Sequence, residues 1–220
     1  MRTARQAVSI GLIGVTLAAH SAAFAAGAAL AGDYVAVGKN PNGTPYKGAV
    51  HIEQRGDIYQ VRWDAGGVTK GTGVVRDSKF IVGYGAQACG VVAYRYQPDG
   101  VLEGLWALPN STHLGSESAT PAKAGTVAGD YLVAGENTDG TRYKGALFVH
   151  ETKDGDLAFQ WRVGTDSFGL GFRDGPLIAA ALGGASCSVV VYTLGSDGTL
   201  AGQWRPPEGG RGTKNARRAE

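Results

Sequence analysis

A repeat constrains this chain more than any other feature of its sequence. Short motifs of the first half return in the same order in the second half, displaced by 97 to 100 residues. The pairs are Gly32-Asp33-Tyr34 with Gly129-Asp130-Tyr131, Tyr46-Lys47-Gly48-Ala49 with Tyr143-Lys144-Gly145-Ala146, Cys89-x-Val91-Val92-x-Tyr94 with Cys187-x-Val189-Val190-x-Tyr192, and Asp99-Gly100-x-Leu102-x-Gly104-x-Trp106 with Asp197-Gly198-x-Leu200-x-Gly202-x-Trp204. This order predicts a tandem duplication. Each copy is then a control for the other, because a residue that only one copy has is not required by the shared fold.

The N-terminus has the pattern of a secretory signal peptide. Arg2 and Arg5 precede an apolar run that ends in small residues, Ala23-Phe24-Ala25. We therefore expect residues 1–25 to be removed, no transmembrane segment, and a protein that is periplasmic, secreted or surface-associated. The sequence has 21 Lys and Arg and 19 Asp and Glu, so loss of the two arginines leaves 19 of each sign. This balance argues against nucleic acid as a partner.

Each repeat alternates apolar and polar residues at period two, which indicates antiparallel strands. Asn-Gly and Asp-Gly pairs such as Asn42-Gly43 and Asp139-Gly140 mark hairpin turns between them. About seven strands per repeat are expected, starting near Asp33, Tyr46, Ile58, Val68, Phe80, Val91 and Val101. The predicted fold class is all-β: two tandem up-and-down meanders, each curled or closed into a small barrel.

Composition sets the expected boundaries. The first β repeat spans residues 31–108 and the second spans 128–206. A Ser-, Thr-, Gly-, Ala- and Pro-rich linker at 109–127 is expected between them. Residues 207–220 combine glycines with Arg211, Lys214, Arg217 and Arg218, which predicts a disordered basic tail.

The two cysteines, Cys89 and Cys187, occupy the same position in the two repeats. In an oxidising compartment they form a candidate disulfide, which requires the duplicated positions to meet with α-carbons less than about 7 Å apart. The alternative is two separately buried thiols that pack as small apolar side chains.

Polar residues shared by the repeats give a candidate binding surface. It consists of Lys47, Gln60 and Arg62 with Lys144, Gln160 and Arg162. If these pairs are equivalent, the same contact forms twice and the protein is a bivalent binder. Recent duplication without divergence is the alternative explanation.

Neither repeat contains a carboxylate pair, a set of metal ligands, a nucleophile with its base or a phosphate-binding loop that the other also has. We therefore expect a protein that is not an enzyme and has no cofactor, metal or catalytic residue.

The motif order resembles small exported bacterial proteins commonly labelled fibronectin-binding proteins. The resemblance rests on Gly-x-Tyr, Asn40-Pro41-Asn42-Gly43, Tyr-x-Gly-x-Val, Gly-Asp-x-Tyr-x-Val-x-Trp, Gly71-x-Gly73, Cys-Gly-Val-Val-x-Tyr and Asp-Gly-x-Leu-x-Gly-x-Trp, and it covers both repeats. It implies an exported adhesin that binds fibronectin or another extracellular matrix protein through two similar units.

A small-ligand carrier is the alternative function. The short meander, the Gly-x-Leu-x-Gly-x-Trp strand and the inward aromatic residues also resemble avidin-like and lipocalin-like barrels. Those barrels bind small molecules in the barrel mouth, so a small-molecule ligand is expected if this resemblance governs function.

Overall fold

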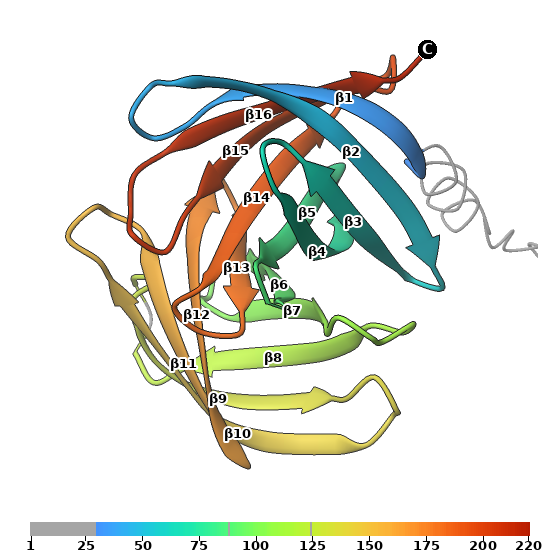
Figure 1. Ribbon diagram of the computed structural model, residues 1–220. Coiled ribbons are helices and arrows are strands. Elements are labelled where there is room, and N and C mark those ends of the chain that lie inside the picture. The colour runs from blue at the N-terminus through green and yellow to red at the C-terminus, as the bar shows by residue number, and fades with distance from the viewer. Residues whose placement is uncertain (1–29, 88, 124) are drawn as a thin grey trace, which may run out of the picture.

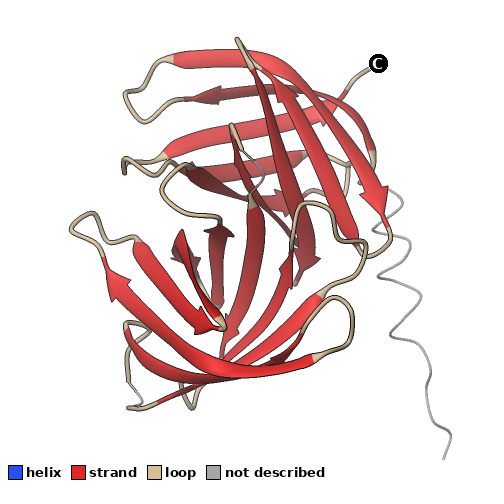
Figure 2. Ribbon diagram, turned by 60° about the horizontal axis from the view of Figure 1, so that its bottom comes forward, coloured by secondary structure: helices blue, strands red, loops and turns tan. Residues whose placement is uncertain are grey.

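The structure is a computed structural model that describes residues 30–87, 89–123 and 125–220. The predicted signal peptide lies outside the described residues. The described residues form sixteen strands and no helix, and the strands close into two antiparallel barrels (Figures 1 and 2). The predicted fold class is therefore confirmed. No helix long and apolar enough to cross a membrane is found in the part of the chain that the structure describes.

One barrel contains both ends of the described chain, and we call it the terminal barrel. Its strands are β1 (Gly32–Lys39), β2 (Pro45–Arg55), β3 (Ile58–Asp64), β4 (Val68–Arg76), β5 (Lys79–Gly85), β14 (Cys187–Leu194), β15 (Leu200–Arg205) and β16 (Gly212–Arg218). It closes where β16 pairs with β1 and where β14 pairs with β5. In Figure 1 its blue to green and its orange to red strands lie together in the upper part of the molecule.

The other barrel is continuous in sequence and interrupts the first, so we call it the inserted barrel. Its strands are β6 (Gly90–Tyr96), β7 (Leu102–Ala107), β8 (Gly115–Pro121), β9 (Gly129–Glu136), β10 (Arg142–Glu151), β11 (Leu157–Val163), β12 (Thr165–Asp174) and β13 (Leu177–Leu182). Each strand pairs with the next along the chain, and β13 closes the barrel on β6.

The barrels therefore do not coincide with the sequence repeats. Each barrel takes five strands from one repeat and three from the other. The chain passes from one barrel to the other after β5 and returns after β13. Strands β14 to β16 of the second repeat take the places in the terminal barrel that β6 to β8 of the first repeat would fill, and β6 to β8 take the equivalent places in the inserted barrel. Every strand therefore has a neighbour equivalent to the one in its own repeat.

Two predicted boundaries are wrong. The expected linker contains β8, and the expected disordered tail contains β16, so each repeat has eight strands and not seven. The alternation at period two is present, since both strands bury every second residue at their start. Their buried residues are small or charged, however, and lack the large apolar side chains by which the other strands were identified.

The hairpin turns follow the prediction. In the turn after β1, the amide of Gly43 donates to Asn40 O at 2.8 Å, and Gly43 has a φ of 84°. In the turn after β9, Gly140 donates to Asn137 O at 2.9 Å with a φ of 82°. A positive φ is easily reached by glycine, which explains the Asn-Gly and Asp-Gly pairs at these turns.

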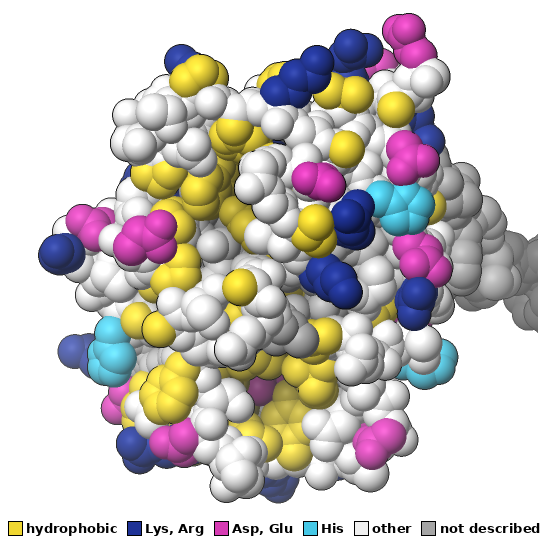
Figure 3. Space-filling view, viewed as in Figure 1, with side chains coloured by type: hydrophobic (Ala, Val, Ile, Leu, Met, Phe, Trp, Pro, Cys, Tyr) yellow, Lys and Arg dark blue, Asp and Glu magenta, His cyan; other side chains and the backbone are white. Residues whose placement is uncertain are grey.

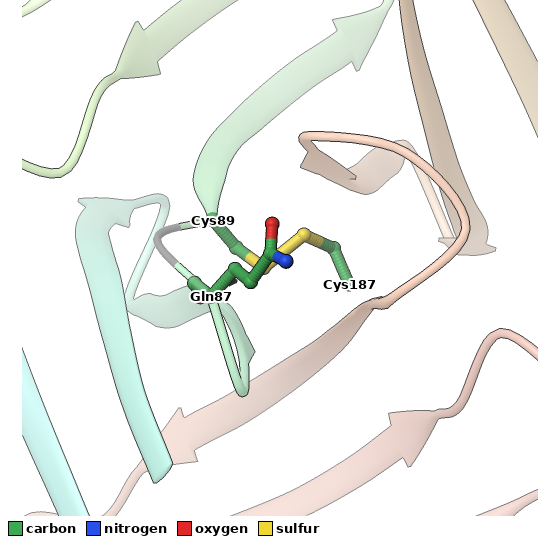
Figure 4. Close-up of a disulfide and its surroundings, with 3 residues drawn as sticks. All are labelled: Gln87, Cys89 and Cys187. Atoms are coloured by element: carbon green, nitrogen blue, oxygen red, sulfur yellow. Dashed lines mark hydrogen bonds between the residues drawn. A yellow bond between two sulfur atoms is a disulfide. The ribbon is translucent and has the colours of Figure 1, made fainter.

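The barrels are joined at the two crossings. Cys89 and Cys187 form a disulfide with α-carbons 5.8 Å apart (Figure 4), so the candidate disulfide is present and the alternative of two separate thiols is not. The outer faces of β5, β6, β13 and β14 bury a shared apolar cluster that includes Ile81, Val91 and Val189. A buried ion pair links Arg205 of the terminal barrel to Asp156 of the inserted barrel at 3.1 Å.

Candidate functional site

Each barrel has a pocket at its mouth, and the two pockets are built from equivalent residues. The terminal pocket has a volume of about 480 Å³ and the inserted pocket about 190 Å³. The strand registers give the following equivalent positions, with the terminal barrel first: Asn40 and Asn137, Tyr46 and Tyr143, Trp63 and Trp161, Tyr84 and Leu182, Tyr192 and Tyr94, Trp204 and Trp106, and Lys214 and Glu117. Hydrophobic side chains are visible inside the recesses of the molecular surface (Figure 3).

Glycines make room for the large rings that form these walls. A Cβ atom on Gly202 would lie 2.6 Å from the Tyr192 ring, and one on Gly104 would lie 2.6 Å from the Tyr94 ring. No side chain fits at either position while the tyrosine ring stays where it is. The repeated Gly-x-Leu-x-Gly-x-Trp motif thus places its second glycine where a tyrosine crosses the barrel interior.

In the inserted pocket, the carboxylate of Glu117 is the acceptor for a set of aromatic donors. Tyr143 Oη donates to Glu117 Oε2 at 3.0 Å, and Tyr94 Oη donates to Oε1. Trp161 Nε1 lies 2.9 Å from Tyr94 Oη and 3.3 Å from Glu117 Oε1. Trp106 Nε1 completes the set by donating to Tyr143 Oη at 3.1 Å.

These bonds stabilise a carboxylate that is only 5 % exposed. Burial raises the pKa of Glu117, while the bonds from Tyr94, Tyr143 and Trp161 act in the opposite direction. The polar groups around Glu117 therefore satisfy one another, and the inserted pocket needs no ligand to do so.

The terminal pocket keeps the aromatic donors but has Lys214 where the inserted pocket has Glu117. Lys214 is 6 % exposed and has no hydrogen-bond or ion-pair partner among the described residues. Its Nζ lies 4.4 Å from the ring centre of Tyr84, 4.6 Å from that of Trp63 and 5.7 Å from that of Trp204. Burial lowers the pKa of Lys214 to about 7.

Three aromatic donors inside the terminal barrel lack an acceptor among the described residues, and two of them, Trp63 and Trp204, line the pocket. They are Trp63 Nε1, Tyr192 Oη and Trp204 Nε1, all fully buried atoms. Trp63 lies near Tyr192 and Trp204 lies near Tyr46, but neither pair has hydrogen-bond geometry. Tyr46 Oη instead donates to the backbone oxygen of Thr213 at 3.0 Å. An ammonium group cannot accept the bonds that Glu117 accepts from Tyr94 and Trp161, so Lys at this position leaves the equivalent Tyr192 and Trp63 without that acceptor.

The strand pairing in the two barrels shows that the expected pairing of Gln60 with Gln160 and of Arg62 with Arg162 is wrong. Val50 pairs with Trp63, and the equivalent Leu147 pairs with Trp161. The two tryptophans are therefore equivalent, at a displacement of 98 residues and not 100. It follows that Gln60 is not equivalent to Gln160, nor Arg62 to Arg162.

The predicted binding surface is not one patch. Lys47, Gln60 and Arg62 lie on the terminal barrel, and Lys144, Gln160 and Arg162 lie on the inserted barrel. The two lysines are equivalent and exposed. Of the others, Gln60 donates to Pro109 O at 2.7 Å, Arg62 is 3.7 Å from Asp64, and Gln160 and Arg162 both contact Asp166.

The sequence prediction missed Lys214 as a site residue and assigned it to a disordered tail. A signal was present: Gly115-Ser-Glu117-Ser-Ala119 and Gly212-Thr-Lys214-Asn-Ala216 share their small residues at a displacement of 97. This weak repeat marks the eighth strand and places Glu117 and Lys214 at the same position.

Comparison of the chain with protein-family models, curated proteins and solved structures gives no match. Binding to fibronectin stays a prediction that rests on the resemblance of sequence motifs.

Proposed function

We propose that this protein binds a small organic molecule in the terminal pocket. The observation that carries the proposal is a cavity of about 480 Å³ lined by Trp63 and Trp204, whose buried indole N–H groups have no hydrogen-bond partner among the described residues. Binding sites for small molecules usually measure about 300 to 1,000 Å³ and combine aromatic walls with a few polar groups. The terminal pocket has this composition, with Tyr46, Trp63, Tyr84 and Trp204 in its wall.

Burial of unpaired polar groups supports the proposal on energetic grounds. A buried donor without an acceptor costs about 1 to 3 kcal/mol, which a ligand that accepts the bond would recover. The inserted pocket offers no such gain, because Tyr94, Trp106, Tyr143 and Trp161 already donate within the protein. Its volume of about 190 Å³ is also smaller.

The four tryptophans allow a direct test, since two line each pocket. A fragment library would be titrated into ¹⁵N-labelled protein, and the four indole N–H signals would be followed by NMR. We expect ligands that shift the signals of Trp63 and Trp204 and leave those of Trp106 and Trp161 in place. Phenylalanine substitution of each tryptophan assigns the signals.

A library in which no compound shifts Trp63 or Trp204 would refute the proposal. Shifts of all four signals together would indicate a change in the whole molecule, and they would also count against a site in the terminal pocket.

A further inference from the structure

The two pockets differ in the sign of one buried charge. Glu117 of β8 and Lys214 of β16 lie at equivalent positions and face equivalent aromatic side chains. The aromatic groups around both are hydrogen-bond donors. A carboxylate can accept the hydrogen bonds of donors that surround it, whereas an ammonium group can only donate and therefore cannot.

The inserted pocket shows what the donors are arranged to hold. Glu117 accepts at both oxygens, with Tyr94 and Trp161 at Oε1 and Tyr143 at Oε2. A planar group with two acceptor oxygens thus fits the space between these rings. The terminal pocket has the equivalent rings and a cation in place of that group.

We propose that the terminal pocket binds a small molecule that carries a carboxylate, which takes the place held by the Glu117 carboxylate in the inserted pocket. The inference rests on the proposed function and names the ligand class. The carboxylate would accept bonds from Trp63 and Tyr192, the equivalents of Trp161 and Tyr94, and pair with Lys214. The body of the ligand would lie in the wider space between Tyr84 and the rim.

The electrostatics of the pocket favour an anion of single charge. Buried charges are stable in proteins when they are paired, and Lys214 has no anionic partner among the described residues. The other ionisable groups that line the pocket are Tyr46 and Tyr84, whose pKa values are raised by burial, and Glu208. The two tyrosines are neutral at the pH values where Lys214 is protonated, so one bound carboxylate would balance the ammonium charge.

Glu208 is the carboxylate of the chain that could compete with a ligand. It lies in the turn between β15 and β16, is exposed and lines the pocket. No ion pair joins it to Lys214, and burial alone accounts for the lowered pKa of Lys214. Substitution Glu208→Gln removes this competing charge and is therefore expected to strengthen carboxylate binding.

The test compares acids with their own amides. A panel of aliphatic and aromatic monocarboxylates, from acetate to phenylbutyrate, and the corresponding primary amides would be titrated while the indole signals are recorded. The acid and the amide have nearly the same shape but differ in charge and in acceptor capacity. We expect at least one acid to shift Trp63 and Trp204 with an affinity at least tenfold above that of its amide.

Lys214 variants provide the second measurement. Lys214→Gln is expected to remove the preference for the acid, and Lys214→Glu is expected to abolish binding of the acid. In the second variant the unliganded signals of Trp63 and Trp204 should also move toward those of Trp161 and Trp106. Glu117→Gln is the matched control in the inserted barrel and should leave acid binding unchanged.

The outcomes separate this inference from the proposed function. If an acid and its amide bind equally well, or if only uncharged fragments bind, the carboxylate inference is wrong and the proposed function stands. If no compound of any class shifts Trp63 or Trp204, both fail. The comparison of acid with amide uses the natural chain, so it holds even where a Lys214 variant does not fold.

Discussion

Replacing Lys214 by methionine is expected to stabilise the unliganded protein and to change how its stability depends on pH. In the unfolded chain a lysine has a pKa of about 10.4, whereas burial in the folded protein lowers the pKa of Lys214 to about 7. Each pKa unit corresponds to about 1.4 kcal/mol. The buried ammonium group therefore costs about 5 kcal/mol at pH values where both states are protonated.

The sign follows from proton binding. Between about pH 7 and pH 10 the unfolded state binds a proton at this position and the folded state does not, so the free energy of unfolding rises with pH. Below about pH 7 the full cost is present. Integration over the window from about pH 7 to pH 9 gives a rise of about 2 kcal/mol for the natural protein that Lys214→Met should lack. The buried tyrosines stay protonated in both states over this window.

Urea unfolding at several pH values from about 6 to 9 provides the measurement, taken as the difference between Lys214→Met and the natural protein. The variant should be more stable at every pH, with the smallest difference at the highest pH. Lys47→Met, at an exposed lysine of the same barrel, should give a curve parallel to that of the natural protein. A Lys214→Met curve that is also parallel would refute the assignment of Lys214 as a buried group with a lowered pKa.

Three further predictions concern the joining of the barrels. Replacing Cys89 and Cys187 by alanine should lower the free energy of unfolding by about 4 kcal/mol, because the disulfide closes a loop of 98 residues; urea unfolding measures the loss. Asp156→Asn should cost about 3 to 5 kcal/mol in the same assay, since it leaves the Arg205 guanidinium buried without its counter-ion. A chain of residues 89–186 should fold alone into the eight strands of the inserted barrel, which amide dispersion in an NMR spectrum would show.

Matched controls make these predictions refutable. Asp64→Asn breaks an exposed contact with Arg62 and should lower the free energy of unfolding by less than about 1 kcal/mol. If Asp156→Asn lowers it by no more than Asp64→Asn does, burial does not strengthen the ion pair and the prediction is wrong. A reducing agent should not lower the stability of the cysteine variant any further. Residues 30–123 correspond to the first sequence repeat and do not contain all the strands of either barrel. A spectrum as well dispersed as that of residues 89–186 would show that a single repeat can close into a barrel.

The strands could be predicted from the sequence where large apolar side chains occupy the inward-facing positions. Tyr59, Val61 and Trp63 alternate with polar residues, and such alternation is the local signal of a half-buried strand. The eighth strands escaped this signal because the neighbouring rings already fill the barrel there. A Cβ on Gly212 would lie 2.1 Å from Trp204, so this inward position of β16 must be glycine while the ring stays where it is.

The exchange of strands between the barrels could not be derived from local patterns. Strands β6 and β14 are equivalent, with Val91 matching Val189 and Tyr94 matching Tyr192. Strand β5 therefore finds the same kind of partner in either one. The choice depends on the crossings near Cys89 and Cys187 and on the apolar cluster between the barrels, which are contacts over long sequence separations.

Glu117 and Lys214 occupy the same position in the two copies, so the difference between them cannot be required by the shared fold. Both barrels close with equivalent strands in the same order, so the fold tolerates either charge at this position. The inserted barrel supplies an internal acceptor for its donors, and its pocket is small. The terminal barrel has the equivalent donors, of which Trp63, Tyr192 and Trp204 have no acceptor among the described residues, and it has a buried lysine and a larger pocket. Unpaired donors around a buried cation lower stability, and an acid that binds them would recover that loss. A buried position at which the two copies carry opposite charges is therefore where we expect a ligand to bind.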